Sequence, residues 1–267
     1  MNKNIDKYDK YDKYANDFDI SVIESIVDLS AYKHKPSRRG SFLFFETFID
    51  GMDQRGKRIL DVGCGVGENA VFHACKGWDN VSAIDISSDS IEVAKQLAEK
   101  FRVQDKIQFQ VGSSNSLPYP DNYFDIVYSH GLLSFVNKSK TIMEMRRVVK
   151  KNGLVIICDT LRAGSVINGI RSLNSKFRKK NIGNYKDILN DKDIDNISTQ
   201  FKSIEVYKFN FISAYYMPFE KIISNAFPIT EGAIERVGGV LAKIDNIILR
   251  CKFLKRYAFK TCIILKK

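Results

Sequence analysis

The sequence predicts an α/β fold, in which helices cover both faces of a mostly parallel sheet. From residue 57 onward, short apolar runs alternate with segments of helical periodicity, which is the pattern of consecutive βαβ units. The first run, 59–62, leads into a turn with glycines at 63, 65 and 67. The next run ends on a lone acid, Asp85, at the strand end where open parallel sheets bind ligands.

Each element of this sheet can be placed from its pattern. The parallel strands are expected at about 58–62, 80–85, 107–111, 124–129 and 154–159. The helices that connect them are expected near 67–77, 88–102 and 138–150, and residues 41–49 should form the helix before the first strand. Farther along, the pattern predicts a helix within 187–200, strands at 201–211 and 258–265, and apolar helices over 217–257.

The glycine turn favours one type of cofactor over another. A turn into a helix N-terminus presents free N–H groups and a partial positive charge, and an acid after the next strand suits a ribose diol. A dinucleotide-binding G-x-G-x-x-G turn would need its third glycine at position 68. The chain has Glu68 there, so the spacing argues against that fingerprint.

Asp61-x-Gly63-x-Gly65-x-Gly67, with Asp85 after the next strand, resembles motif I and the following acidic position of the class I S-adenosyl-L-methionine (SAM) methyltransferases. The segments 117–125 and 147–153 are similar to two further motifs of that family, so the resemblance covers roughly residues 11–160. It implies a seven-stranded, mostly parallel Rossmann-like sheet whose last strand is antiparallel and lies between strands 5 and 6.

The resemblance also implies a division of the chain. Residues 1–50 would form an N-terminal helical lid, 51–216 the SAM-binding α/β core, 217–257 a helical cap insertion, and 258–267 the final core strand.

SAM is the cofactor that the resemblance implies. The five scattered cysteines, an odd number without C-x-x-C pairs, argue against a metal site or a disulfide framework. The glycines would admit its methionine and ribose, Asp85 would accept the ribose hydroxyls, and Ser113 and Ser114 stand where the family usually has Asp-Ala beside adenine. The candidate cofactor-binding residues are Tyr11, Arg38, Asp61, Gly63, Cys64, Gly65, Gly67, Asp85, Ile86, Ser113, Ser114, Asn115, Ser129 and His130.

Two of the three histidines are candidate catalytic residues. His130 follows strand 4, at the position that lines the methyl-transfer cleft in this fold, and an imidazole there can take a proton near neutral pH. His130 can equally line the pocket without acid–base work. His34 belongs to the predicted lid, and His73 lies inside the helix after the glycine turn, where packing is the simpler role.

Composition and charge limit the cellular compartment and the kind of partner that we expect. Hydrophobic residues make up 44% of the chain, no apolar run is long enough to span a bilayer, and the charged start lacks the apolar core of a signal peptide. Five scattered cysteines favour a reducing cytoplasm. The net charge of +11, with basic clusters at 171–180 and at the end of the chain, favours an anionic partner, although both clusters can be ordinary solvated surface.

The preferred function is methyl transfer from SAM to a small, anionic acceptor. A nucleotide-linked or phosphorylated sugar, or a phosphoramidate or other phosphoryl oxygen of a surface polysaccharide, would fit this charge, and the end of the chain is similar to bacterial polysaccharide and natural-product methyltransferases. Three alternatives stay open: an RNA methyltransferase, a quinone or lipid methyltransferase with basic helices on a membrane surface, and a non-catalytic SAM-binding protein. No nucleic-acid-binding module or oligomeric state is predicted.

Overall fold

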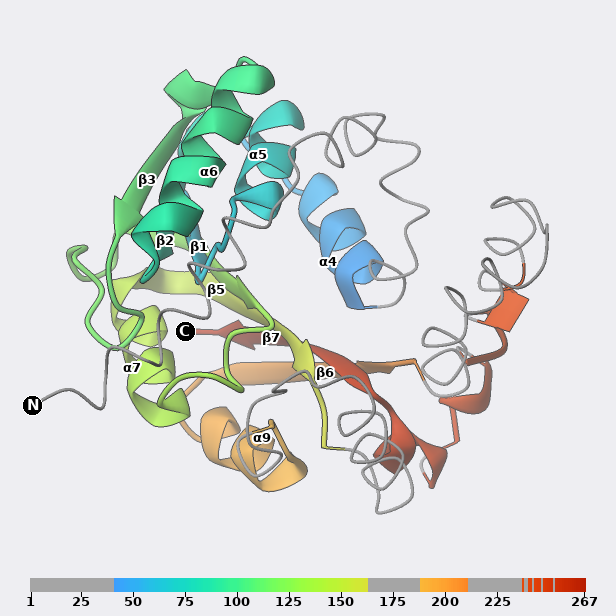
Figure 1. The fold of residues 1–267 in the computed structure, drawn as a ribbon. Helices are drawn as coiled ribbons and strands as arrows, with labels where there is room; N and C mark the ends of the chain where they lie inside the picture. The colour runs from blue at the N-terminus through green and yellow to red at the C-terminus, as the bar shows by residue number, and fades with distance from the viewer. Residues whose placement is uncertain are drawn as a thin grey trace, which may run out of the picture.

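The computed structural model describes residues 41–162, 188–210, 237, 240–241, 243–245, 247–251 and 253–267. Its centre is a seven-stranded sheet in the order β3-β2-β1-β4-β5-β7-β6 (Figure 1). The strands are β1 (Ile59–Val62), β2 (Val81–Asp85), β3 (Ile107–Val111), β4 (Phe124–His130), β5 (Val149–Thr160), β6 (Ser203–Phe209) and β7 (Lys260–Lys266).

The pairing confirms the predicted sheet. β1 to β5 pair in parallel, whereas β7 runs antiparallel to both β5 and β6 and lies between them. Every predicted strand is present, and β3 has the predicted bounds.

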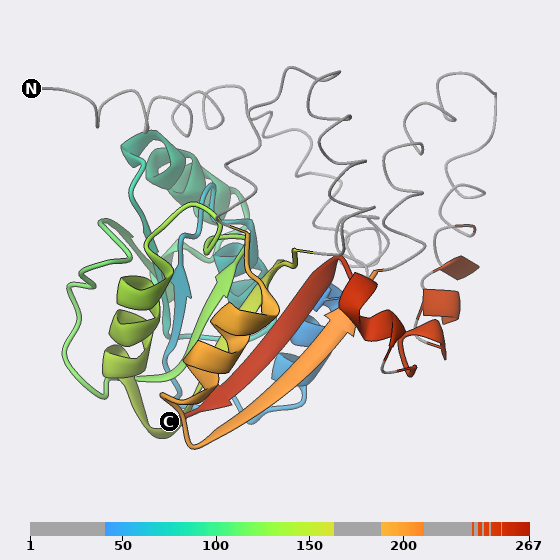
Figure 2. The ribbon, with the colours of Figure 1, turned by 90° about the horizontal axis from the view of Figure 1, so that it is seen from below.

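Helices cover both faces, as expected (Figure 2). They are α4 (Ser41–Asp50), α5 (Glu68–Cys75), α6 (Ser88–Lys100), α7 (Lys138–Val148) and α9 (Asp191–Ser198), with short 3-10 turns η2 (Gln104–Lys106) and η4 (Leu254–Tyr257). Neighbouring residues of β1 point to opposite faces: Ile59 packs in the cluster with α4, α5 and α6, and Leu60 packs in the cluster with α7 and α9. Two apolar layers therefore fix the sheet in place.

Most elements end within two residues of the predicted bounds, and β5 and α9 differ most in length from the prediction. β5 begins at Val149 rather than near 154 and passes through Asn152, which has φ 64°. Asparagine tolerates this left-handed conformation better than most residues do. α9 is shorter than the predicted 187–200, because the Asn190 side chain and Asp193 cap each other's backbone and fix the helix start.

The division into lid, core and cap stays a prediction, because residues 1–40 and 211–236 lie outside the described residues. Within the predicted lid, α4 is described, and its Phe45 and Ile49 are buried in the core. In the described part of the chain, no helix is long and apolar enough to cross a membrane.

Candidate active site

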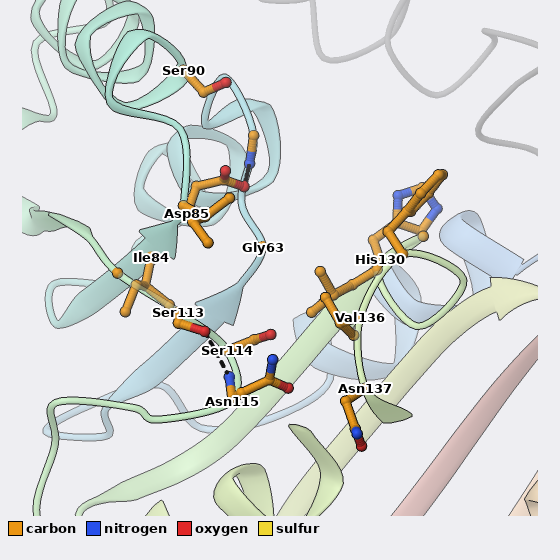
Figure 3. Close-up of a pocket in the computed structure, with 16 residues that line it drawn as sticks. Gly63, Ile84, Asp85, Ser90, Ser113, Ser114, Asn115, His130, Val136 and Asn137 are labelled. Carbon is orange, nitrogen blue, oxygen red and sulfur yellow. Dashed lines mark hydrogen bonds between the residues drawn. The ribbon is translucent and has the colours of Figure 1, made fainter. Parts of the chain in front are cut away.

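A cavity of about 640 Å³ opens at the C-terminal ends of β1, β2 and β4 (Figure 3). This is the edge at which an open parallel sheet is expected to bind a ligand. Its walls come from the glycine turn after β1, the end of β2, the turn after β3, and the loop after β4. The lining residues are Gly63, Gly65, Ile84, Asp85, Ile86, Ser90, Gly112, Ser113, Ser114, Asn115, His130, Gly131, Leu132, Phe135, Val136 and Asn137.

The glycine turn after β1 is needed for both conformation and space. Gly63, Gly65 and Gly67 have φ values of 73°, 54° and 79°, a region that glycine enters without the cost to a Cβ. A Cβ on Gly65 would meet nothing within 4 Å, whereas one on Gly67 would lie 2.6 Å from Ala94 Cβ of α6. Gly65 thus leaves room at the cavity, and Gly67 lets α5 and α6 approach closely.

Asp85 is oriented by backbone donors on both of its oxygens. The Gly65 N–H donates to Oδ2 at 2.8 Å, and the Ser87 N–H donates to Oδ1 at 3.0 Å. A carboxylate offers about four acceptor positions, so these contacts leave capacity for two hydroxyl groups. Figure 3 shows Asp85 beside the glycine turn at the cavity.

The turn after β3 is fixed by hydrogen bonds within itself and to α7. The Asn115 N–H donates to Ser113 Oγ at 3.2 Å. Thr141 Oγ1 lies 3.1 Å from Ser114 Oγ and donates to Asn115 Oδ1 at 3.1 Å. The polar atoms of this wall therefore have set positions, which suits recognition of a flat heterocycle.

The loop after β4 forms the opposite wall and is tied to β5. The Gly131 N–H donates to the Cys158 carbonyl at 2.8 Å, and the Leu133 N–H donates to Asp159 Oδ2 at 2.8 Å. Burial raises the pKa of Asp159 to about 6, while the N–H groups of Thr160 and Leu133 oppose that shift. These contacts place His130, the last residue of β4, at the cavity.

Asp61 lies buried behind the glycine turn. It is 1% exposed, and neither carboxylate oxygen has a hydrogen-bond partner among the described residues. Burial raises the pKa of Asp61 to about 7; the nearby Tyr128 hydroxyl lowers the pKa, and the charge of Asp85 raises it further. Burial also raises the pKa of the Cys64 thiol, so this cysteine stays protonated.

We expect Asp61→Asn to stabilise the protein at alkaline pH. Because the pKa of Asp61 is raised from 3.8 to about 7, its contribution to stability is present below about pH 4 and is lost as the pH rises to about 7. The neutral amide avoids that loss. Urea denaturation should show the variant to be more stable than wild type by about 2–4 kcal/mol at pH 8, with little difference near pH 4.

Asp159→Asn is the matched control for this prediction. Asp159 is also buried, but its oxygens accept the N–H groups of Leu133 and Thr160, which an amide cannot both satisfy. This variant should gain no stability at pH 8. Equal stability of Asp61→Asn and wild type at pH 8 would contradict the burial of an ionised Asp61.

The structure brings most of the predicted site residues together. At the cavity lie Gly63, Gly65, Asp85, Ile86, Ser113, Ser114, Asn115 and His130. Asp61, Cys64, Gly67 and Ser129 are buried and do not line it. Tyr11, His34, Arg38 and the basic segment 171–180 lie outside the described residues. His73 is buried, edge-on to Phe45 and Tyr128, in agreement with a packing role.

The sequence reasoning missed several lining residues, chiefly in the loop after β4. They are Ile84, Ser90, Gly112, Gly131, Leu132, Phe135, Val136 and Asn137. Five of these residues, those in the loop after β4, could have been identified because they follow a strand that ends at the ligand-binding edge.

Comparison with known proteins shows which family the α/β core resembles. Residues 60–157 match the family model described as a methyltransferase domain. The chain is similar to ajmaline N-methyltransferase of Rauvolfia serpentina, with 36% identity over 117 residues, covering 43% of this chain and 40% of that protein. It is also similar to methyltransferase GfsG of Streptomyces halstedii, with 27% identity over 148 residues, covering 52% and 53%. The chain thus spans about half or less of the length of these relatives.

A solved structure shares the fold. It is geranyl diphosphate C-methyltransferase from Streptomyces coelicolor A3(2), in complex with Mg²⁺, geranyl diphosphate and S-adenosyl-L-homocysteine (SAH). The TM-score is 0.57 at 14% identity, covering 84% of this chain and 77% of that chain.

Proposed function

Since residues 60–157 form a domain of the class I SAM-dependent methyltransferase family, we propose that the chain transfers a methyl group from SAM to a small acceptor beside His130. The observation that carries this proposal is the Asp85 carboxylate, oriented by two backbone N–H groups and facing a cavity that Gly65 leaves open. The cavity has a volume within the range of small-molecule and cofactor sites.

The residues present fit SAM. Asp85 has the acceptor capacity for a ribose diol, the turn 113–115 offers fixed polar atoms to adenine, and Gly65 leaves space for the methionine part. When bound, SAM supplies the methyl group on a sulfonium sulfur. The contribution of the chain is alignment, which by itself can lower a barrier by several kcal/mol.

We propose that His130 takes the proton of the substrate when the methyl group is transferred to a neutral hydroxyl or to the nitrogen of an ammonium group. It lies at the end of β4, across the cavity from the turn after β3 (Figure 3). For an acceptor that is already an anion, no base is needed, and His130 serves to shape the site.

We propose an anionic acceptor: a nucleotide-linked or phosphorylated sugar, or a phosphoramidate or other phosphoryl oxygen of a surface polysaccharide. The net charge of +11 supports this class, and the structural relative from Streptomyces coelicolor is described with a diphosphate ligand. All five cysteines are free thiols, which supports a reducing cytoplasm as the proposed location.

A quinone or lipid acceptor is the second candidate, because Leu132, Phe135 and Val136 make one wall of the cavity apolar. Activity assays with nucleotide sugars and with quinones, under equal conditions, would separate the two candidates.

Replacing Asp85 with alanine tests the cofactor site directly. The variant leaves a ribose diol without its acceptor, so SAH should bind more weakly by about 1–3 kcal/mol, roughly a 5- to 150-fold increase in Kd. Isothermal titration calorimetry measures the change. Glu92→Ala, on the exposed side of α6, is the control and should bind SAH as wild type does. Absence of SAM and SAH binding by the intact protein would overturn the proposal.

A further inference from the structure

An exposed apolar stripe lies on helical residues before η4, which the structure describes at 237, 240–241, 243–245 and 247–248. Val237, Val240, Ile244 and Ile247 are 46%, 55%, 38% and 66% exposed. Their spacing of three and four residues places them on one side of a helix. Phe253, just beyond this helix, is 60% exposed. All five side chains are thus at least 38% exposed.

Basic side chains surround this stripe. Residues 237–256 contain five basic residues and a single acid, Asp245, which is buried. Lys243 and Arg250 are exposed and fall within one helical turn of Ile247. The Arg256 guanidinium stacks 3.9 Å above the Phe253 ring. The basic residues in this part of the sequence are Lys243, Arg250, Lys252, Lys255 and Arg256.

We propose that this face, residues 237–256, docks on an anionic lipid surface. An apolar stripe bordered by lysine and arginine is the pattern of a helix that lies in the interface of a bilayer. Each basic side chain is attracted to anionic headgroups while the valine and isoleucine side chains enter the acyl boundary. Single-stranded nucleic acid is recognised by successive aromatic platforms, whereas four of these five exposed side chains are aliphatic and Arg256 stacks on the ring of Phe253. A second copy of the chain would bring two strongly basic faces together.

The chain connects this face directly to the edge of the sheet that bears the cavity. The chain passes from η4 into β7, whose first residue, Lys260, pairs with Thr160 at the C-terminal end of β5. β4 ends at the same edge, with His130 opposite Cys158. Figures 1 and 2 show the described part of 237–257 beyond the ends of β6 and β7. Docking through this face brings the edge that bears the cavity near the bilayer.

Vesicle flotation of the full chain tests this proposal. The probes are vesicles of phosphatidylcholine alone and of phosphatidylcholine with about one third phosphatidylglycerol. Wild type should float with the anionic vesicles only, and less so at high salt. Val240→Asp with Ile247→Asp should weaken binding more than tenfold. Lys243→Gln with Arg250→Gln should weaken it about fivefold per charge removed.

Met143→Asp is the matched control, because Met143 is 59% exposed on α7, far along the chain from this face. It should float as wild type does. All variants should keep wild-type circular dichroism and SAH affinity, so that membrane binding is read separately from the cofactor site. Three results would each overturn the proposal: no binding of wild type to anionic vesicles, equal binding by the Val240→Asp/Ile247→Asp variant, or a concentration-dependent dimer that this variant abolishes.

Discussion

His130→Ala is expected to lower kcat by about 10²–10⁴-fold for an acceptor that reacts at a neutral hydroxyl or ammonium group. His130 is the one histidine that lines the cavity among the described residues, and an imidazole titrates near neutral pH. Removal of the ring leaves the proton of the acceptor without a base. SAH affinity should change little, because Asp85 and the turn after β3 stay in place.

Two further measurements separate a proton acceptor from a residue that only shapes the cavity. Added imidazole should restore part of the rate of His130→Ala, and the variant should lose the acidic limb of the pH–rate profile. A loss under about tenfold, with no rescue, would show that the acceptor is already an anion or that another group takes the proton. A normal rate would remove the base role and leave the cofactor site intact.

Gly67→Ala is expected to destabilise the fold by about 3 kcal/mol or more. The left-handed conformation at φ 79° costs alanine about 1–2 kcal/mol. The new methyl group would also lie 2.6 Å from Ala94 Cβ and 3.1 Å from Ala94 Cα, so helix α6 must shift away from α5. Thermal denaturation should show a fall in Tm of about 6–12 °C.

Gly65→Ala is the matched comparison for this change. Gly65 also has a positive φ, 54°, but its Cβ would meet nothing within 4 Å. The variant should lose only the conformational cost, about 1–2 kcal/mol, while its methyl group enters the cavity and weakens SAH binding. Comparison of the two alanine variants should thus separate the effect on the stability of the fold from the effect on SAH affinity. An equal loss of stability in both variants would contradict the role assigned to the α5–α6 contact.

The parts of the fold that the sequence predicted best are those with a strong local cause. β1 and β2 are continuous buried runs, and such runs are typical of parallel strands. The glycine spacing and Asp85 identified the ligand-binding edge. Each of these signals depends on the identity of a single residue: a glycine permits a positive φ, and an acid at a strand end offers a carboxylate to a ligand.

The parts that were not predicted depend on contacts that are remote in sequence. The first residues of β5, around Lys150 and Asn152, are polar, and their conformation depends on contacts with the residue after β7, because the Asn152 N–H donates to the Lys267 carbonyl. In the loop after β4, Leu132 lines the cavity whereas Leu133 is fully buried. A turn has no fixed periodicity, so composition alone could not separate these two leucines.

The place of β7 in the sheet has a consequence for how the protein is made. β6 pairs with β7 and with no other strand of the described sheet, and β7 comes about fifty residues later in the chain. During translation, β6 leaves the ribosome without a partner, and its edge and that of β5 stay unpaired until residues 260–266 emerge. Contacts so distant in sequence slow folding, and unpaired strand edges promote aggregation. The nascent chain is therefore most exposed to misassembly in the interval between synthesis of residue 209 and release of β7.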